Sequence, residues 1–157
     1  MKQTSVAEQA ATNFMNGYNC GQAVLAAFAP RFGLSEEQAM RIAAAFGGGM
    51  GRQRMTCGTV QALAVLSGLA YGNTTPADKA RMARSFDCIK DLTEQFKAQW
   101  GSAVCGEILG LKGFCKAEGP AHQQVVPDEY RGKPCALKVR LAAQLFEQSL
   151  RQEAASK

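Results

Sequence analysis

Four of the six cysteines stand at or just inside the predicted start of a helix, which is the clearest indication of chemistry in this chain. They are Cys20, Cys57, Cys105 and Cys135. The first turn of a helix offers unpaired backbone N–H groups and about half a positive charge, and both favour a thiolate over a thiol. The thiolate is the form of cysteine that attacks disulfides, binds metal ions and is oxidised. If the four helix starts converge in the fold, the cysteines form a redox or metal centre.

The length and composition of the chain favour a single helical domain. The chain has 157 residues, the usual size of one domain. Hydrophobic residues, many of them alanine, make up 46% of it and aromatic residues only 8%, a mixture that suits packed helices better than strands. No repeat, linker or low-complexity tract divides the sequence. We therefore expect one all-α domain over residues 1–157, a multi-helix bundle with a central apolar helix at about 57–69.

Charge and hydropathy exclude two classes of partner. The net charge is +5, but the basic residues are scattered and form no stripe with interleaved aromatic residues, so nucleic-acid binding is not expected. No segment approaches the roughly 20 apolar residues that span a bilayer, and the N-terminus lacks the apolar stretch of a signal peptide. The prediction is a cytoplasmic protein. Static disulfides are unusual in that compartment, so several cysteines indicate catalysis, redox sensing or metal binding.

Apolar residues at helical spacing place the expected helices. These cover about residues 5–17, 20–29, 35–46, 57–69, 76–99, 103–109 and a final helix from 134. The helix at 57–69 carries apolar side chains in nearly every direction and is therefore expected to be central.

Capping residues and apolar stripes refine these helices. Ser35 and Gln38 form a capping box, Thr56 is a plausible N-cap for the central helix, and Thr75-Pro76 is expected to open the long helix. The buried stripe of the long helix is expected to contain Met82, Phe86, Ile89, Phe96 and Trp100.

Three further features have weaker chemical meaning. The glycine-rich stretch 47–52 fits neither the dinucleotide pattern nor the P-loop pattern, so its expected role is to let backbone pass close to another element. Cys88 lies in mid-helix and is expected to pack. The irregular segment 110–133 holds His122, expected to be a surface residue, and Cys115, a candidate shuttle or resolving thiol.

The ordered set of cysteines and glycines is similar to a known family. The segments are Asn19-Cys20-Gly21-Gln22-Ala23-Val24, Gly49-Met50-Gly51-Arg52 with Thr56-Cys57-Gly58, Cys105-Gly106-Glu107-Ile108-Leu109-Gly110, and Cys135 on the final helix. They resemble the redox-active C_GCAxxG_C_C family over about residues 10–150. The resemblance implies that Cys20, Cys57, Cys105 and Cys135 occupy its four cysteine positions and that Gly58 matches the glycine after the second cysteine. Thr59 and Ala62 depart from its alanine and its closing glycine. The resemblance implies no substrate.

Three hypotheses remain open from the sequence. The first is thiol–disulfide or electron-transfer chemistry by cysteines that the fold brings together, as in a thiol–disulfide oxidoreductase, and it requires no cofactor. The second is a zinc, copper or iron–sulfur site built from the same four cysteines. The third is a structural or interaction protein with buried thiols.

Under the redox hypothesis, Cys57 is the expected most reactive thiol, because basic residues Arg52 and Arg54 flank it. Four cysteines permit three pairings, and the sequence does not select one. The redox partner, a protein or a small molecule, is unknown at this point, and a homo-oligomer stays open.

Overall fold

The computed structural model describes residues 4–157, and these form an all-α fold as predicted. The α-helices are α1 (Val6–Met15), α2 (Cys20–Phe28), α3 (Glu36–Ile42), α4 (Gly47–Met50), α5 (Gly58–Tyr71), α6 (Lys79–Trp100), α7 (Cys105–Ile108) and α8 (Cys135–Ala155). Short 3-10 helices cover Ala29–Phe32, Pro120–Gln123 and Asp128–Tyr130. No strand forms within residues 4–157, where Thr56 and Val104 make an isolated antiparallel bridge.

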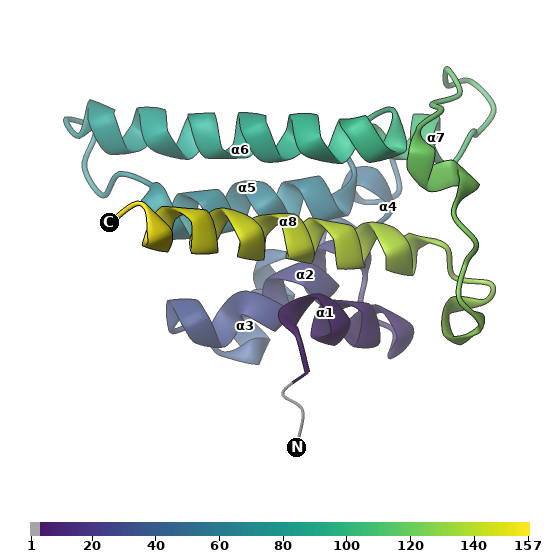
Figure 1. The fold of residues 1–157 in the computed structure, drawn as a ribbon, viewed down its shortest axis with the longest axis horizontal. Helices are drawn as coiled ribbons and strands as arrows, with labels where there is room; N and C mark the ends of the chain where they lie inside the picture. Colours follow the sequence, from purple (N-terminus) through teal and green to yellow (C-terminus); the bar gives the residue numbers. More distant parts are fainter. Residues whose placement is uncertain (1–3) are drawn as a thin grey trace.

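Helix α5 is the central helix, as the sequence predicts. It contacts α2, α6 and α8, and its Leu63 and Leu66 side chains are fully buried. In Figure 1, α6 covers one side of the α5–α8 layer, and α1, α2 and α3 cover the other. The starts of α8 and α7 lie with α4 at the same end of the molecule, on the right of the view. This arrangement brings several helix starts to one region.

Helix capping agrees with the sequence at one predicted start and differs at two. The Ser35–Gln38 capping box at α3 is present. Thr56 does not cap α5, because Cys57 holds the N-cap position and no side chain accepts a hydrogen bond there. Thr75 does not cap α6, because the Asp78 carboxylate accepts from the Arg81 amide and the helix begins three residues after Pro76. An ionised carboxylate satisfies free amides at a helix start at least as well as a hydroxyl.

The apolar stripes are correct in outline and wrong at particular positions. Leu92 and Phe96 of α6 are fully buried, whereas Phe86, predicted to be in the stripe, is 53% exposed. Only one side of α6 is covered by α5 and α8 near that position. On α5, Leu69 is 40% exposed, so the central helix is not covered along its whole length.

No helix that the structure describes between residues 4 and 157 is both long and apolar enough to span a lipid bilayer.

Candidate functional site

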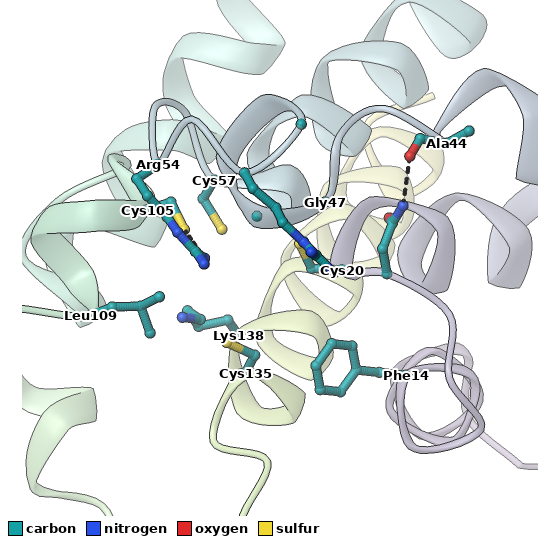
Figure 2. Close-up of a pocket in the computed structure, with 14 residues that line it drawn as sticks. Phe14, Cys20, Ala44, Gly47, Arg54, Cys57, Cys105, Leu109, Cys135 and Lys138 are labelled. Atoms are coloured by element: carbon teal, nitrogen blue, oxygen red, sulfur yellow. Dashed lines mark hydrogen bonds between the residues drawn. The ribbon is translucent and has the colours of Figure 1, made fainter. Parts of the chain in front are cut away.

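The starts of α2, α5, α7 and α8 converge on one cavity of about 510 Å³. All four cysteines singled out in the sequence line it: Cys20, Cys57, Cys105 and Cys135. Cys20, Cys105 and Cys135 are the first residues of their helices, and Cys57 is the N-cap of α5. Figure 2 shows their side chains around a common space. Thiols from distant parts of the chain therefore share one pocket.

The four thiols differ in access to solvent. Cys57 is 3% exposed and Cys105 is 7% exposed, while Cys20 and Cys135 are half-buried. Cys135 also lines a neighbouring surface pocket with Phe14 and Tyr18. Among the four, Cys135 thus lies where the cavity meets the outer surface.

Backbone pairing holds the Cys57 and Cys105 segments side by side. The Cys57 amide donates to the Ala103 carbonyl at 2.7 Å, and the Cys105 amide donates to the Met55 carbonyl at 2.6 Å. These bonds flank the Thr56–Val104 bridge. The amides of both cysteines are engaged in the backbone, so neither is free to stabilise its own sulfur.

The position of Cys20 depends on a close approach between α2 and α5. A Cβ atom added to Gly58 would lie 2.5 Å from the Cys20 sulfur, which leaves no room for any residue but glycine. Asn19 caps α2 with Gln22 and also donates to the Ala44 carbonyl at 3.0 Å. The Cys20 sulfur therefore packs directly against the peptide that follows Cys57.

Burial dominates the acidity of the two central thiols. Burial, and next the charge of a neighbouring Cys57 thiolate, raise the pKa of Cys20 to about 11. Burial also raises the pKa of Cys57, against the opposing charge of Lys138. The sequence left open whether burial or the helix dipole would win at Cys57, and burial wins. The prediction that Cys57 is the most reactive thiol rested on the flanking Arg52 and Arg54, and burial acts against it.

The other thiols of the cavity also act on these two. Charge on Cys57 or on Cys135 raises the pKa of Cys20, and charge on Cys105 raises the pKa of Cys57.

Basic side chains form the rest of the polar lining. Lys138 is only 3% exposed, and its amino group lies 5.7 Å from the centre of the Trp100 ring. Arg54 Nη1 lies 4.0 Å from the Cys105 sulfur. Arg52 also lines the cavity. In Figure 2 the Lys138 amino group and the Arg54 guanidinium both point into the space between the cysteines.

The glycine-rich segment presents the arginines in a left-handed turn. Residues 48–52 all have positive φ, between 61° and 70°, and Arg54 has a φ of 63°. Consecutive left-handed residues are rare, and each non-glycine among them costs roughly 1–2 kcal/mol. A Cβ added to Gly49 would lie 2.6 Å from the Cys105 Cβ. The segment allows backbone to pass close to another element, which is the role expected from its sequence.

The other candidate residues lie away from the cavity. Cys88 lies on α6 and packs toward α5, where the Ser67 hydroxyl donates to its sulfur at 3.3 Å. Cys115 is exposed and does not line the cavity. The exposed His122 has Nε2 at 3.0 Å from the Trp100 carbonyl oxygen. Within residues 4–157, no three Cys, His, Asp or Glu side chains are grouped closely enough to hold a metal ion, and all six cysteines are free thiols.

Lys138 is the lining residue that the sequence analysis missed. It lies three residues after Cys135 on α8, so the two side chains share a face of the helix. That spacing was the signal in the sequence, but a lysine on a helix is normally solvated, and only the fold shows that this one is enclosed.

Comparison with known proteins gives one match. The model of a family described as "Putative redox-active protein (C_GCAxxG_C_C)" matches residues 18–149, most of the chain. No curated protein and no solved structure matches this chain.

Proposed function

The chain belongs to the C_GCAxxG_C_C family, and we propose that it transfers electrons by thiol–disulfide exchange in its cysteine cavity. The observation that carries the proposal is the convergence of Cys20, Cys57, Cys105 and Cys135 on one cavity. We further propose that Cys20 and Cys57 form the disulfide of the oxidised protein.

The choice of this pair follows from contact between α2 and α5. The Cys20 sulfur lies where a Gly58 side chain would begin, one residue after Cys57. The charge of Cys57 is also the strongest charged influence on the Cys20 thiol. A disulfide requires Cα atoms within about 7 Å, and the packing of Cys20 against the Cys57–Gly58 peptide favours such a pair. Cys135 at the cavity mouth is suited to the first exchange with an outside disulfide.

The reaction balances with a disulfide as oxidant. A cavity thiolate attacks one sulfur of the outside disulfide, forms a mixed disulfide and releases one thiolate. A second cavity thiol, after losing its proton, attacks the protein sulfur of the mixed disulfide and releases the second thiolate. An exchange that begins at Cys135 first gives a Cys135–Cys20 disulfide. The Cys57 thiolate then attacks the Cys20 sulfur, forms the Cys20–Cys57 bond and releases Cys135, which takes up the proton that Cys57 lost. The protein gains one disulfide, and the two thiolates released from the oxidant take up the two protons.

The zinc hypothesis lacks corresponding support from geometry. Four thiolates around one zinc ion must converge to within about 2.3 Å of it, and the described side chains form no such group.

Disulfide mapping tests the proposal, because the six cysteines fall on six different tryptic peptides. Reduced protein is treated with oxidised dithiothreitol or hydroxyethyl disulfide, remaining thiols are alkylated, and the peptides are identified by mass spectrometry. We expect four free thiols after oxidation and a linked pair of the Cys20 and Cys57 peptides.

Variants outside the cavity provide matched controls. Cys88→Ser and Cys115→Ser should oxidise as the unmodified chain does, whereas Cys57→Ser should not form the pair. Six alkylated thiols after oxidant treatment of the folded protein would contradict the redox proposal. Metal analysis of protein purified without oxygen tests the alternative, since stoichiometric zinc or iron would favour it.

A further inference from the structure

Lys138 is an enclosed cation without a counter-ion. Its side chain is 3% exposed, and within residues 4–157 it makes no ion pair and no hydrogen bond, only the contact with the Trp100 ring. The amino nitrogen itself is not fully buried, so the carbon chain packs in the protein while the charged end reaches the cavity. Lys138 lines the cysteine cavity, so the space into which it points is the place for a partner.

The protein itself does not supply the missing negative charge. The cavity lining contains Lys138, Arg52 and Arg54 but neither aspartate nor glutamate. The remaining acidic groups in the lining are thiols, and burial raises the pKa of both Cys20 and Cys57. These two thiols stay neutral near pH 7 and leave the cations uncompensated.

We propose that the cavity binds a small sulfur compound that carries a carboxylate, with the carboxylate at Lys138 and Arg54 and the sulfur beside the cysteines. The binding of the carboxylate stands on the buried lysine, and the identification of the compound as a thiol or disulfide substrate rests on the proposed function. A cavity of about 510 Å³ is within the range of small-molecule sites.

The direction of the two cations determines how the compound is oriented. Arg54 Nη1 lies 4.0 Å from the Cys105 sulfur, and Lys138 follows Cys135 by one helical turn. A carboxylate that binds both cations lies close to the sulfurs of Cys105 and Cys135. Such an anchor places the disulfide bond of a short dicarboxylate beside the cavity thiols, where exchange proceeds as described above.

Binding is tested first with a probe that cannot exchange. 3,3′-Thiodipropionate has two carboxylates and a thioether but no disulfide bond. We expect it to raise the melting temperature of the reduced protein and to lose this effect in Lys138→Met and Arg54→Gln. The exposed Lys112→Met is the matched control and should keep the effect.

The melting temperature of Lys138→Met can also be predicted in the absence of ligand. Methionine matches the shape of lysine and keeps the packing of its carbon chain, while the charged end that it removes reaches the cavity. The variant should therefore melt at about the same temperature as the unmodified chain and should no longer be stabilised by the probe. If Lys138→Met fails to fold, the loss of stabilisation by the probe is measured in Arg54→Gln.

Exchange is then measured with three disulfides of nearly equal size and different charge. These are 3,3′-dithiodipropionate (anionic), hydroxyethyl disulfide (neutral) and cystamine (cationic). Rates are divided by those of the unfolded chain in urea, which removes the intrinsic reactivity of each disulfide. We expect the anionic disulfide to be favoured about tenfold over the neutral one, the usual effect of one charge-assisted hydrogen bond, and Lys138→Met to abolish the preference.

The two experiments separate the two proposals. If all three disulfides oxidise the cavity cysteines at equal normalised rates and the probe gives no shift, the carboxylate site is overturned and the redox function stands. If no disulfide oxidises the cavity while the probe still stabilises the protein through Lys138, the carboxylate site stands and the redox function falls.

Discussion

Cys57 is surrounded by groups that act on its thiol in opposite directions. Burial raises its pKa, while Lys138 and the Thr59 hydroxyl, 3.1 Å from the sulfur, lower it. The net shift of the pKa is upward, because the desolvation free energy of the thiolate exceeds the stabilisation that these partners provide. Cys57 is therefore suited to a later step of exchange, where it attacks a disulfide already formed beside it, and not to the first attack on an outside molecule.

Cys20 should show its raised pKa in the pH dependence of alkylation. Only the thiolate reacts, so the rate rises about tenfold per pH unit until the pH passes the pKa of the thiol. For Cys20 in the folded, reduced protein we expect this rise to continue to about pH 11, whereas an ordinary cysteine levels off near its reference value of about 8.5. Iodoacetamide labelling followed by peptide mass spectrometry measures the rate at Cys20 alone.

The unfolded chain is the control for that measurement. In urea the Cys20 peptide should follow the pH dependence of an ordinary thiol, and circular dichroism at each pH verifies that the protein without urea stays folded. A plateau near pH 9 in the folded protein would show that the cavity does not disfavour the thiolate.

At the residue scale, the sequence predicted which thiols meet but not what surrounds them. Cys20, Cys57, Cys105 and Cys135 could be selected because each stands at a helix start, which is a local property. The enclosure of Lys138 and the burial of Cys57 depend on where α8 and α5 lie relative to each other. Those are tertiary properties, and no spacing within a single helix fixes them.

Two glycines of α5 offer a direct comparison at the element scale. A Cβ at Gly58 would lie 2.5 Å from the Cys20 sulfur and 2.7 Å from the Phe46 carbonyl oxygen, while a Cβ at Gly68 meets nothing within 4 Å. Alanine stabilises a helix interior by about 1 kcal/mol relative to glycine. We expect Gly68→Ala to stabilise the protein by about that amount.

Gly58→Ala should act in the opposite direction. Both contacts are too short for real atoms, and one is to backbone, so α2 and α5 must separate; overpacking of this kind costs about 1–3 kcal/mol. Urea denaturation of both variants gives the difference. We also expect Gly58→Ala to slow formation of the Cys20–Cys57 disulfide. Equal stability of the two alanine variants would show that α2 does not pack against Gly58 as described.

Elements were predictable where the signal was local. The Ser35–Gln38 capping box placed the start of α3 correctly, although α3 ends at Ile42 and not at about residue 46. The apolar periodicity placed α5 to within two residues at each end. The start of α6 was wrong because Thr75-Pro76 and Asp78 offer competing caps within four residues, and the chain uses the carboxylate. The left-handed turn at residues 48–52 could not be foreseen, because two of its residues, Met50 and Arg52, are not glycine and such residues rarely adopt positive φ.

At the scale of the whole molecule, the cavity lies where the helices of the bundle begin. Helix α2 contacts α1, α5 and α8, and α5 contacts α2, α6 and α8. A covalent bond between Cys20 and Cys57 would therefore join two helices that both pack in the main core. The redox state of the cavity is then coupled to the stability of the bundle and not only to the local site.

This coupling predicts a higher melting temperature for the oxidised protein. A Cys20–Cys57 disulfide closes the loop of residues 20–57, and restricting the unfolded chain in this way stabilises the folded state by about 4 kcal/mol. For a chain of this size each kcal/mol raises the melting temperature by about 2–4 °C, so we expect a rise of about 10 °C on oxidation. Circular dichroism melts of the reduced and oxidised forms measure it. The rise should persist in Cys115→Ser and Cys88→Ser and vanish in Cys57→Ser, because only the last removes a sulfur of the proposed pair. Identical melts of the two redox forms would mean that oxidation links no two distant parts of the core.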